Sequence, residues 1–168
     1  VSDMNLSGNE RFILTANNSI DETTASRLRV NVHPAGTVVF PKIGGAIATN
    51  KRRLLVKPTA IDNNCLGLTP NGTLSSEYLY LLLSSIDLTR YQAGTSVPAL
   101  SQGVLADIIV GVPPLAEQHR IVAKVDELMA LCDRLEAQQA DAESAHAHLV
   151  QALLDSLTQA SDATDFAT

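Results

Sequence analysis

The sequence predicts an α+β fold: a β-rich head followed by one long α-helix. Between residues 29 and 72, short apolar runs are broken by glycine and proline, which is typical of a sheet with tight corners. After Pro113 and Pro114, apolar residues recur at steps of four and three over more than four heptads, which predicts a long helix. Hydrophobic residues make up 45% of the 168, enough for a core, although the only aromatics are three Phe and three Tyr.

The head is expected to alternate short strands with one buried helix. The stretch "SSEYLYLLLSSIDL" places leucines at helical spacing and predicts a helix over 75–86. A loop containing Gly94 and Gly103 should follow it. Strands are expected at 30–32, at 38–40, around Ile47, at 54–56, within 61–72 and at 108–112.

The long helix is predicted over 115–158. Pro114 suits the first helical position, and Glu117 falls in the first turn, where the helix dipole favours a negative charge. At 1.5 Å per residue this helix is roughly 65 Å long. A head of this size has a radius of gyration of about 13 Å. A helix packed along its own domain would leave leucines exposed, so we expect a second helix as its partner.

The apolar seam of that helix has two alternating core positions. Gln139, Ala142 and His146 weaken its centre, and polar core residues usually select register or partner at a cost in stability. The seam consists of Ile121, Val125, Leu128, Cys132, Leu135, Gln139, Ala142, His146, Leu149 and Leu153.

The net charge of −6 is unevenly distributed. Residues 1–113 contain nine Lys or Arg and eight Asp or Glu, a net of +1, whereas residues 114–168 contain three against ten, a net of −7. The acidity belongs to the helix and tail, so the overall charge does not exclude nucleic acid as a ligand of the head.

Motifs for catalysis and for metal binding are missing from the sequence. It has no GxxxxGK[ST] loop, no GxGxxG and no HExxH, and "VPPL" lacks the polar and aromatic residues of a methyltransferase motif. Cys65 and Cys132 form no CxxC pair, and His146 and His148 fall on different sides of a helix. We therefore expect no catalytic residue, no metal and no cofactor in this chain. With no apolar run long enough to span a membrane and no signal peptide, a cytoplasmic protein is expected.

A basic cluster in the β-rich part is the main candidate for binding. It is interleaved with Gly44 and Gly45, which would let backbone approach a ligand, and it consists of Lys42, Lys51, Arg52, Arg53 and Lys57. The alternative is that "KRR" is solvated surface that discourages strand pairing at an edge.

Several segments resemble the specificity subunit of type I restriction-modification systems. These are "GTVVFPKIGGAIATNKRRLL", "DNNCLGLTP" and "AGTSVPALSQGVLADIIVGVPPLAEQHRIVAKVDELMALCDRLE", of which "PPLAEQHRIVAKVDELM" is the most specific. The resemblance runs from about residue 36 to 157. A full subunit of this family has two target recognition domains, each reading half of a split DNA sequence, and two long helices that pair antiparallel and set the gap.

The resemblance implies the following organisation. Residues 1–112 would be a target recognition domain, 113–159 a coiled-coil helix and 160–168 a flexible tail. Partners would be double-stranded DNA, methyltransferase subunits that use S-adenosylmethionine, and through them the restriction subunit. The chain has one head and one helix and lacks the usual N-terminal stretch with its tryptophan. We therefore expect an incomplete N-terminus, and either a half-subunit that forms an antiparallel homodimer or a fragment.

By position, the resemblance places two segments of the head against DNA. Lys42, Lys51, Arg52, Arg53 and Arg90 would hold phosphates, beside Gly44 and Gly45. Candidates for base edges are Asn50, Gln92, Thr95 and Ser96. For Thr95 and Ser96, ordinary hydrogen bonding within loops is the alternative. A non-DNA adaptor, with a protein-binding head on a dimeric coiled coil, stays open as a different class of function. The target sequence is not predictable from the chain.

Overall fold

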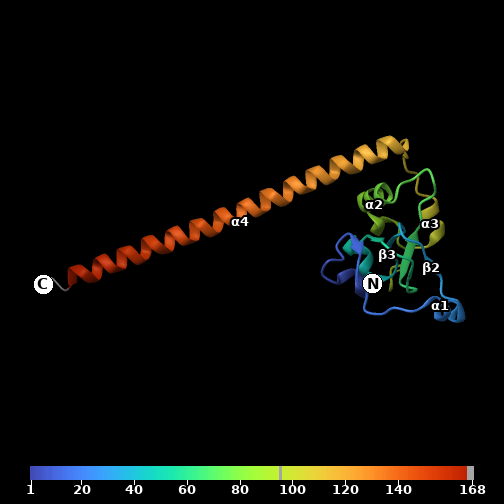
Figure 1. The fold of residues 1–168 in the computed structure, drawn as a ribbon, viewed down its shortest axis with the longest axis horizontal. Helices are drawn as coiled ribbons and strands as arrows, with labels where there is room; N and C mark the ends of the chain where they lie inside the picture. The colour runs from blue at the N-terminus through green and yellow to red at the C-terminus, as the bar shows by residue number, and fades with distance from the viewer. Residues whose placement is uncertain (95, 166–168) are drawn as a thin grey trace. The chain divides into compact units, whose positions relative to one another are not determined.

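The computed structural model describes residues 1–94 and 96–165, without the side chains of residues 157 and 159–165. The chain divides into two compact units, Val1–Val122 and Ala123–Thr168. The first unit is the α+β head together with the start of the long helix, and the second is the remainder of that helix (Figure 1). The expected fold class is confirmed.

A four-stranded sheet forms the centre of the head. Its order is β1 (Phe12–Ile13), β4 (Arg53–Leu55), β3 (Val38–Pro41) and β6 (Cys65–Leu68). β1 is parallel to β4, and β3 is antiparallel to both β4 and β6. A second pair, β2 (Val32–His33) and β5 (Thr59–Ala60), is antiparallel.

Strand β3 is buried on both of its faces. Because side chains alternate along a strand, Val38 and Phe40 pack on one side with Leu79 and Leu83 of helix α2. Val39 faces the other side, where the cluster contains Met4, Ile13, Leu55 and Cys65. This explains why "VVFP" is a continuous apolar run rather than an alternating one.

Side-chain caps begin the short helices of the head. Asp21 caps α1 (Glu22–Leu28), Ser75 caps α2 (Ser76–Ser85) and Ser101 caps α3 (Gln102–Ala106), each accepting from a backbone N–H. Three 3₁₀-helices, η1 (Ser2–Asn5), η2 (Gly44–Thr49) and η3 (Leu88–Tyr91), lie between them. The last element is α4 (Leu115–Asp165), 51 residues long.

The sequence predicted some of these elements correctly and others wrongly. Strands β3, β4 and β6 and helices α2 and α4 are confirmed. The strand expected around Ile47 is wrong, because Gly44 has φ +69° and starts a 3₁₀-helix that buries Ile47. The strand expected at 108–112 is also wrong: this segment has no ladder partner in the described residues, and Ile109 is 98% exposed. The strand expected at 30–32 begins only at Val32, as β2, and the elements that were not expected are β1, β5, α1, α3, η1 and η3.

Two further expectations concern membranes and cysteines. None of the helices in the described residues combines the length and the hydrophobicity that a transmembrane span needs. Cys65 is buried and Cys132 is exposed, and both are free thiols. No group of three potential metal ligands is found among those residues.

Candidate functional site

The structure brings together the two segments that the sequence singled out. Residues 42–50 and 92–100, here called the paired loops, lie side by side at the end of β3. Gly44 N–H donates to Pro98 O at 2.7 Å, and Leu100 N–H donates to Lys42 O at 2.8 Å. The loops are 50 residues apart in the sequence, and backbone hydrogen bonds hold them as one surface.

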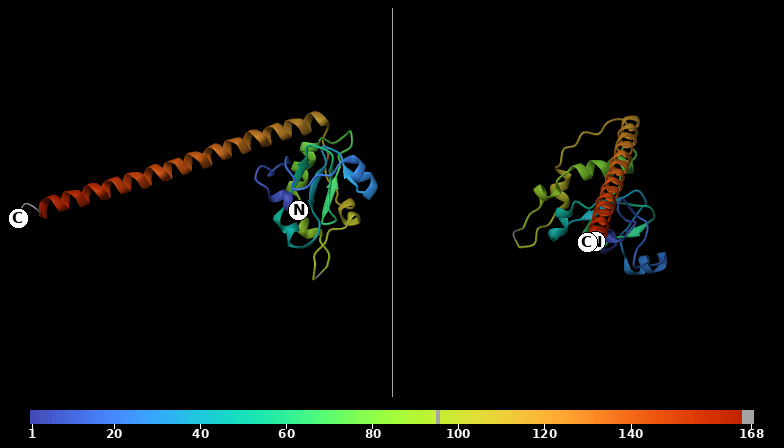
Figure 2. Two further views of the ribbon diagram at one scale, coloured as in Figure 1. Left: turned by 60° about the horizontal axis from the view of Figure 1, so that its bottom comes forward. Right: turned by 90° about the vertical axis from the view of Figure 1, so that its left-hand side faces the viewer.

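The second paired loop is a hairpin that protrudes from the head (Figure 2). Ala93 and Ala99 close it with two backbone hydrogen bonds of 2.9 and 2.8 Å. Gly94 has φ +99°, and a Cβ there would lie 2.7 Å from the carbonyl oxygen of Val97, so this turn requires glycine. Gln92 and Ser96 are exposed on the hairpin, and Thr95 lies outside the described residues.

The first paired loop exposes backbone as well as side chains. The positions of added Cβ atoms on Gly44 and Gly45 would have open space around them. Asn50 is exposed, adopts a left-handed conformation with φ 51°, and donates from Nδ2 to Ser84 O at 3.1 Å. Both candidate types for DNA contact, open backbone and amide side chains, are therefore present on this loop.

The expected basic residues divide into reachable and enclosed ones. The side chain of Arg90 is 80% exposed and pairs loosely with Asp87, with 3.8 Å between Nε and Oδ2. Lys42 is half-buried, and half-buried Lys51 donates from Nζ to Asn5 Oδ1. These three cations are at or near the surface.

Arg52 is enclosed, with only 2% of its surface exposed. Its Nε donates to Leu83 O at 3.3 Å and Nη1 donates to Lys51 O at 3.0 Å. Its guanidinium lies 5.4 Å from the ring centroid of Phe40. Burial lowers the pKa of Arg52 to about 10, so it remains charged at neutral pH. The carbonyls at the C-terminal end of α2, the negative end of the helix dipole, help to stabilise this buried charge.

Arg53 is also fastened to the head. Its Nη1 donates to Arg52 O at 2.8 Å and its Nη2 donates to Met4 O at 3.0 Å. The structure therefore gives two arginines of "KRR" internal partners. Of the residues expected to hold phosphates, Lys42, Lys51 and Arg90 remain reachable.

Gln118, which sequence reasoning missed, fixes the first turns of α4. Its side chain is fully buried. Oε1 accepts from Ser75 N–H at 2.8 Å, and Nε2 donates to Thr73 O and to Pro113 O, both at 2.8 Å. A signal was available: Gln118 stands three residues before Ile121, where the seam would continue, and a polar residue there needs buried partners.

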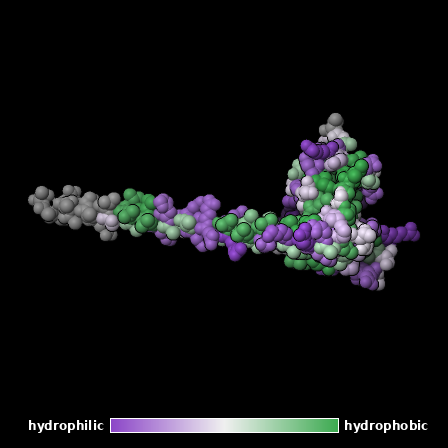
Figure 3. Space-filling model, turned by 90° about the horizontal axis from the view of Figure 1, so that it is seen from above, coloured by the Kyte–Doolittle hydropathy of each residue, from purple (hydrophilic) through white to green (hydrophobic). Residues whose placement is uncertain are grey.

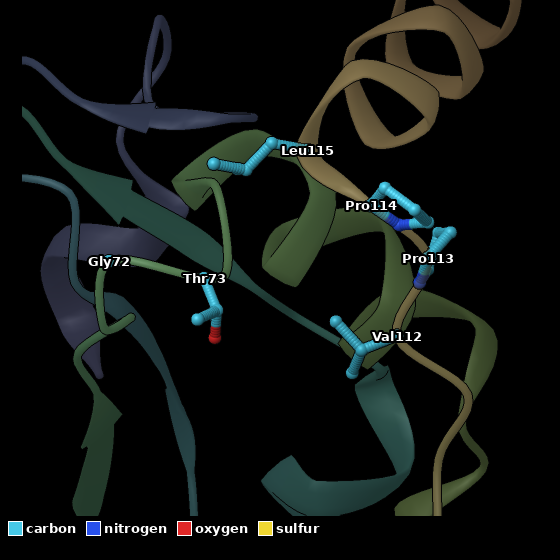
Figure 4. A pocket seen from close by; sticks show the side chains of 6 residues that line it. All are labelled: Gly72, Thr73, Val112, Pro113, Pro114 and Leu115. Atoms are coloured by element: carbon cyan, nitrogen blue, oxygen red, sulfur yellow. The ribbon is translucent and has the colours of Figure 1, made fainter.

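A hollow lies beside this contact. Figure 4 shows Gly72 and Thr73 on one side and the segment from Val112 to Leu115 on the other. Tyr78 adds a hydrogen bond from its hydroxyl to Gly111 O at 3.3 Å. The segment before α4 is therefore held by α2 as well as by the turn at 71–74.

The seam of α4 is mostly exposed. Leu128, Leu135, Leu149 and Leu153 are 48 to 58% exposed. Figure 3 shows the corresponding apolar stretches on the helix with a hydrophilic stretch between them. Cys132, Gln139 and His146 are likewise exposed, and Ile121 and Val125 are half-buried.

Comparisons with known proteins identify the family of this chain. The family model described as "Type I restriction modification DNA specificity domain" matches residues 13–143. The chain belongs to this family. The match covers the central sheet, both paired loops and the first part of α4.

The sequence is also similar to two specificity subunits of Escherichia coli. The chain is 44% identical over 55 residues to the EcoAI specificity subunit of Escherichia coli, covering 33% of this chain and 9% of that protein. It is 31% identical over 88 residues to the EcoDI specificity subunit of the same organism, covering 50% and 20%. The chain thus spans a fifth or less of the length of these relatives.

The fold resembles two solved structures. One is the HsdS subunit from Thermoanaerobacter tengcongensis, with a TM-score of 0.57, 27% identity, and coverage of 66% of this chain and 30% of that one. The other comes from work on complex assembly and conformational transition of the type I restriction-modification system, with a TM-score of 0.59, 25% identity, and coverage of 74% and 31%.

Proposed function

We propose that this chain is a DNA-recognition component of a type I restriction-modification complex. The head binds double-stranded DNA and reads one half of a split target. The chain catalyses no reaction: the methyltransferase subunits bind S-adenosylmethionine and dock on α4, and the restriction subunit joins through them. Membership of the specificity-domain family, in a match that includes both paired loops, is the observation that carries this proposal. A cytoplasmic location is part of it.

The chemistry of the paired loops supports DNA as the ligand. Exposed amides on Asn50 and Gln92 can donate to and accept from base edges. The exposed backbone at Gly45 and the cations Lys42, Lys51 and Arg90 suit phosphates. These roles follow from accessibility and residue type. Arg52 is left out because it is buried, and Arg53 because its guanidinium donates to two backbone carbonyls.

Pairing of α4 with a second copy is part of the proposal. Exposed leucines on both sides of a polar centre require an apolar partner. Charge favours an antiparallel pair. Residues 136–158 contain four acidic residues and no Lys or Arg, whereas 115–135 contain all three cations of the helix: Arg120, Lys124 and Arg134. A parallel pair would place the acidic segment against itself.

The pairing is testable by light scattering. The expected mass is about twice the 17.9 kDa of one chain. Leu149→Glu should give monomers, because it places a charge in the seam, whereas Gln151→Glu, outside the seam, should leave the dimer intact. A monomer in the unaltered chain at micromolar concentration would exclude self-pairing.

DNA binding is tested by a gel shift with mixed-sequence duplex, with and without a methyltransferase subunit of a type I system. Binding that appears or sharpens when the methyltransferase subunit is present is the expected result. A chain that binds this subunit but adds no DNA affinity to it would instead be an adaptor that binds only protein.

A further inference from the structure

We propose that Gln118 is a positioning residue that fixes the root of α4 to the head and thereby sets the gap length that the assembled protein accepts between two DNA half-sites. The root is defined as residues 115–122, which belong to the same compact unit as the paired loops. This inference rests on the function proposed above. It adds a determinant of specificity that lies outside the DNA-facing surface.

The hydrogen bonds of Gln118 fix the rotation of the helix, which filling the same space with an apolar side chain would not do. An apolar side chain of similar size would also fill the space, but the amide makes three hydrogen bonds of 2.8 Å to two backbone segments, one containing Thr73 and Ser75 and the other Pro113. Turning the helix by one residue, about 100°, would break all three. Buried polar groups without partners are costly, so one helix rotation is strongly preferred.

Helix α2 connects this contact to the paired loops. Near its N-terminus, Ser75 N–H donates to Gln118. Near its C-terminus, Ser84 O accepts from Asn50 Nδ2 at 3.1 Å and Leu83 O accepts from Arg52 Nε at 3.3 Å. Its ten residues span about 15 Å, so one short helix with both ends bonded stands between the root of α4 and the first paired loop.

A small change of angle at the root has a large effect farther along the helix. From Val122 to Leu153 the helix rises about 47 Å. A tilt of about 10° at the root therefore displaces its far end by about 8 Å, which exceeds two base-pair steps of about 3.4 Å. The preferred gap length should depend on how firmly the root is held.

The test uses the full chain assembled with a methyltransferase subunit and duplexes whose half-sites are separated by gaps that differ by one base pair. Gln118→Leu should reduce severalfold the preference for the best gap over its neighbours. Ser75→Ala is the matched control: it removes the hydroxyl that accepts from Tyr78 N–H but keeps the backbone N–H that Gln118 accepts. It should lower stability without changing the gap preference.

A second measurement needs no DNA. Amide hydrogen exchange at residues 119–122 of the full chain should be faster in Gln118→Leu and unchanged in Ser75→Ala, while α2 remains protected in Gln118→Leu. Unchanged hydrogen exchange at 119–122 in Gln118→Leu would overturn the proposal that Gln118 fastens the root of α4 to the head, independently of the result with DNA.

The two measurements separate the possible failures. If hydrogen exchange in Gln118→Leu is faster but its DNA affinity falls equally at every gap length, the role in setting the gap is overturned and the proposed DNA recognition is unaffected. If the complex of the unaltered chain shows no preference for any gap length, both the role of Gln118 in setting the gap and the proposed reading of a split target are overturned. Hydrogen exchange would still show whether the Gln118 amide fastens the helix.

Discussion

Arg90→Gln and Arg52→Met should affect the salt dependence of DNA binding differently, because only Arg90 presents its charge to solvent. The Arg90 side chain is 80% exposed, and its ion pair with Asp87 is long and solvated, so little is lost when the pair opens. Arg52 is 2% exposed and bonded to Leu83 O and Lys51 O. Methionine fills similar space but leaves the carbonyl oxygens of Leu83 and Lys51 without this donor, which should cost about 1–3 kcal/mol of stability.

The expected size follows from counterion release. Each phosphate contact contributes about 0.9 to the slope of log affinity against log salt. Raising salt from about 50 to about 200 mM therefore weakens binding by about 3.5-fold for each contact. The loss of affinity over this range should be about 3.5-fold smaller for Arg90→Gln than for the unaltered chain, and the same as the unaltered chain for Arg52→Met.

Fluorescence anisotropy of the assembled protein on labelled duplex measures both slopes, with circular dichroism to verify that each variant is folded. Equal slopes for Arg90→Gln and the unaltered chain would remove Arg90 from the contact surface. A reduced slope for folded Arg52→Met would show that the buried guanidinium does reach DNA, and would refute the division between reachable and enclosed cations.

Three other predictions concern stability, and chemical denaturation or circular dichroism measures each. Gly94→Ala should cost about 1–2 kcal/mol and weaken DNA binding, because φ is +99° and the added methyl would meet Val97 O, whereas Gly103→Ala, with open space, should be neutral or stabilising. Leu83→Ala should cost about 2–5 kcal/mol, because Leu83 is 6% exposed in the main core. Hydrogen bonds from the Arg120 guanidinium hold the pKa of the Glu117 carboxyl below its usual 4.5. The charge of Glu117 therefore stabilises the start of α4 above that pH, and this stabilisation is lost as the pH falls through the lowered pKa. Glu117→Gln should remove this acid dependence of stability.

Local patterns in the sequence predicted the elements with strong periodicity. The apolar run "VVFP" predicts a strand and the leucine spacing of 76–85 predicts a helix without reference to distant residues, and both elements are present. Elements that depend on distant partners were missed: β1 has two residues and exists because Phe12 and Ile13 pair with Leu54 and Leu55. The apolar run at 108–112 shows the reverse, since a strand-like sequence forms no strand without a partner.

The candidate site was predictable as segments but not as side chains. The family resemblance placed "KIGGAIATNKRR" and "RYQAGTSVPALS" against DNA, but their pairing through Gly44 and Pro98 depends on tertiary hydrogen bonds that no local pattern contains. Sequence also could not separate Arg52 from Lys51. The end of α2, where Leu83 O accepts from Arg52 Nε, decides which of these neighbours is enclosed. The roles of all these residues in DNA binding stay predictions.

We propose that two copies of this chain read the two halves of a split DNA target. Selection of duplexes from a random pool by the chain assembled with a methyltransferase subunit, followed by sequencing, tests it most directly. Because the paired chains are identical, the account predicts one short half-site that occurs twice, in inverted orientation, at a fixed gap. No enrichment beyond that of the methyltransferase subunit alone, or a single uninterrupted site, would contradict it.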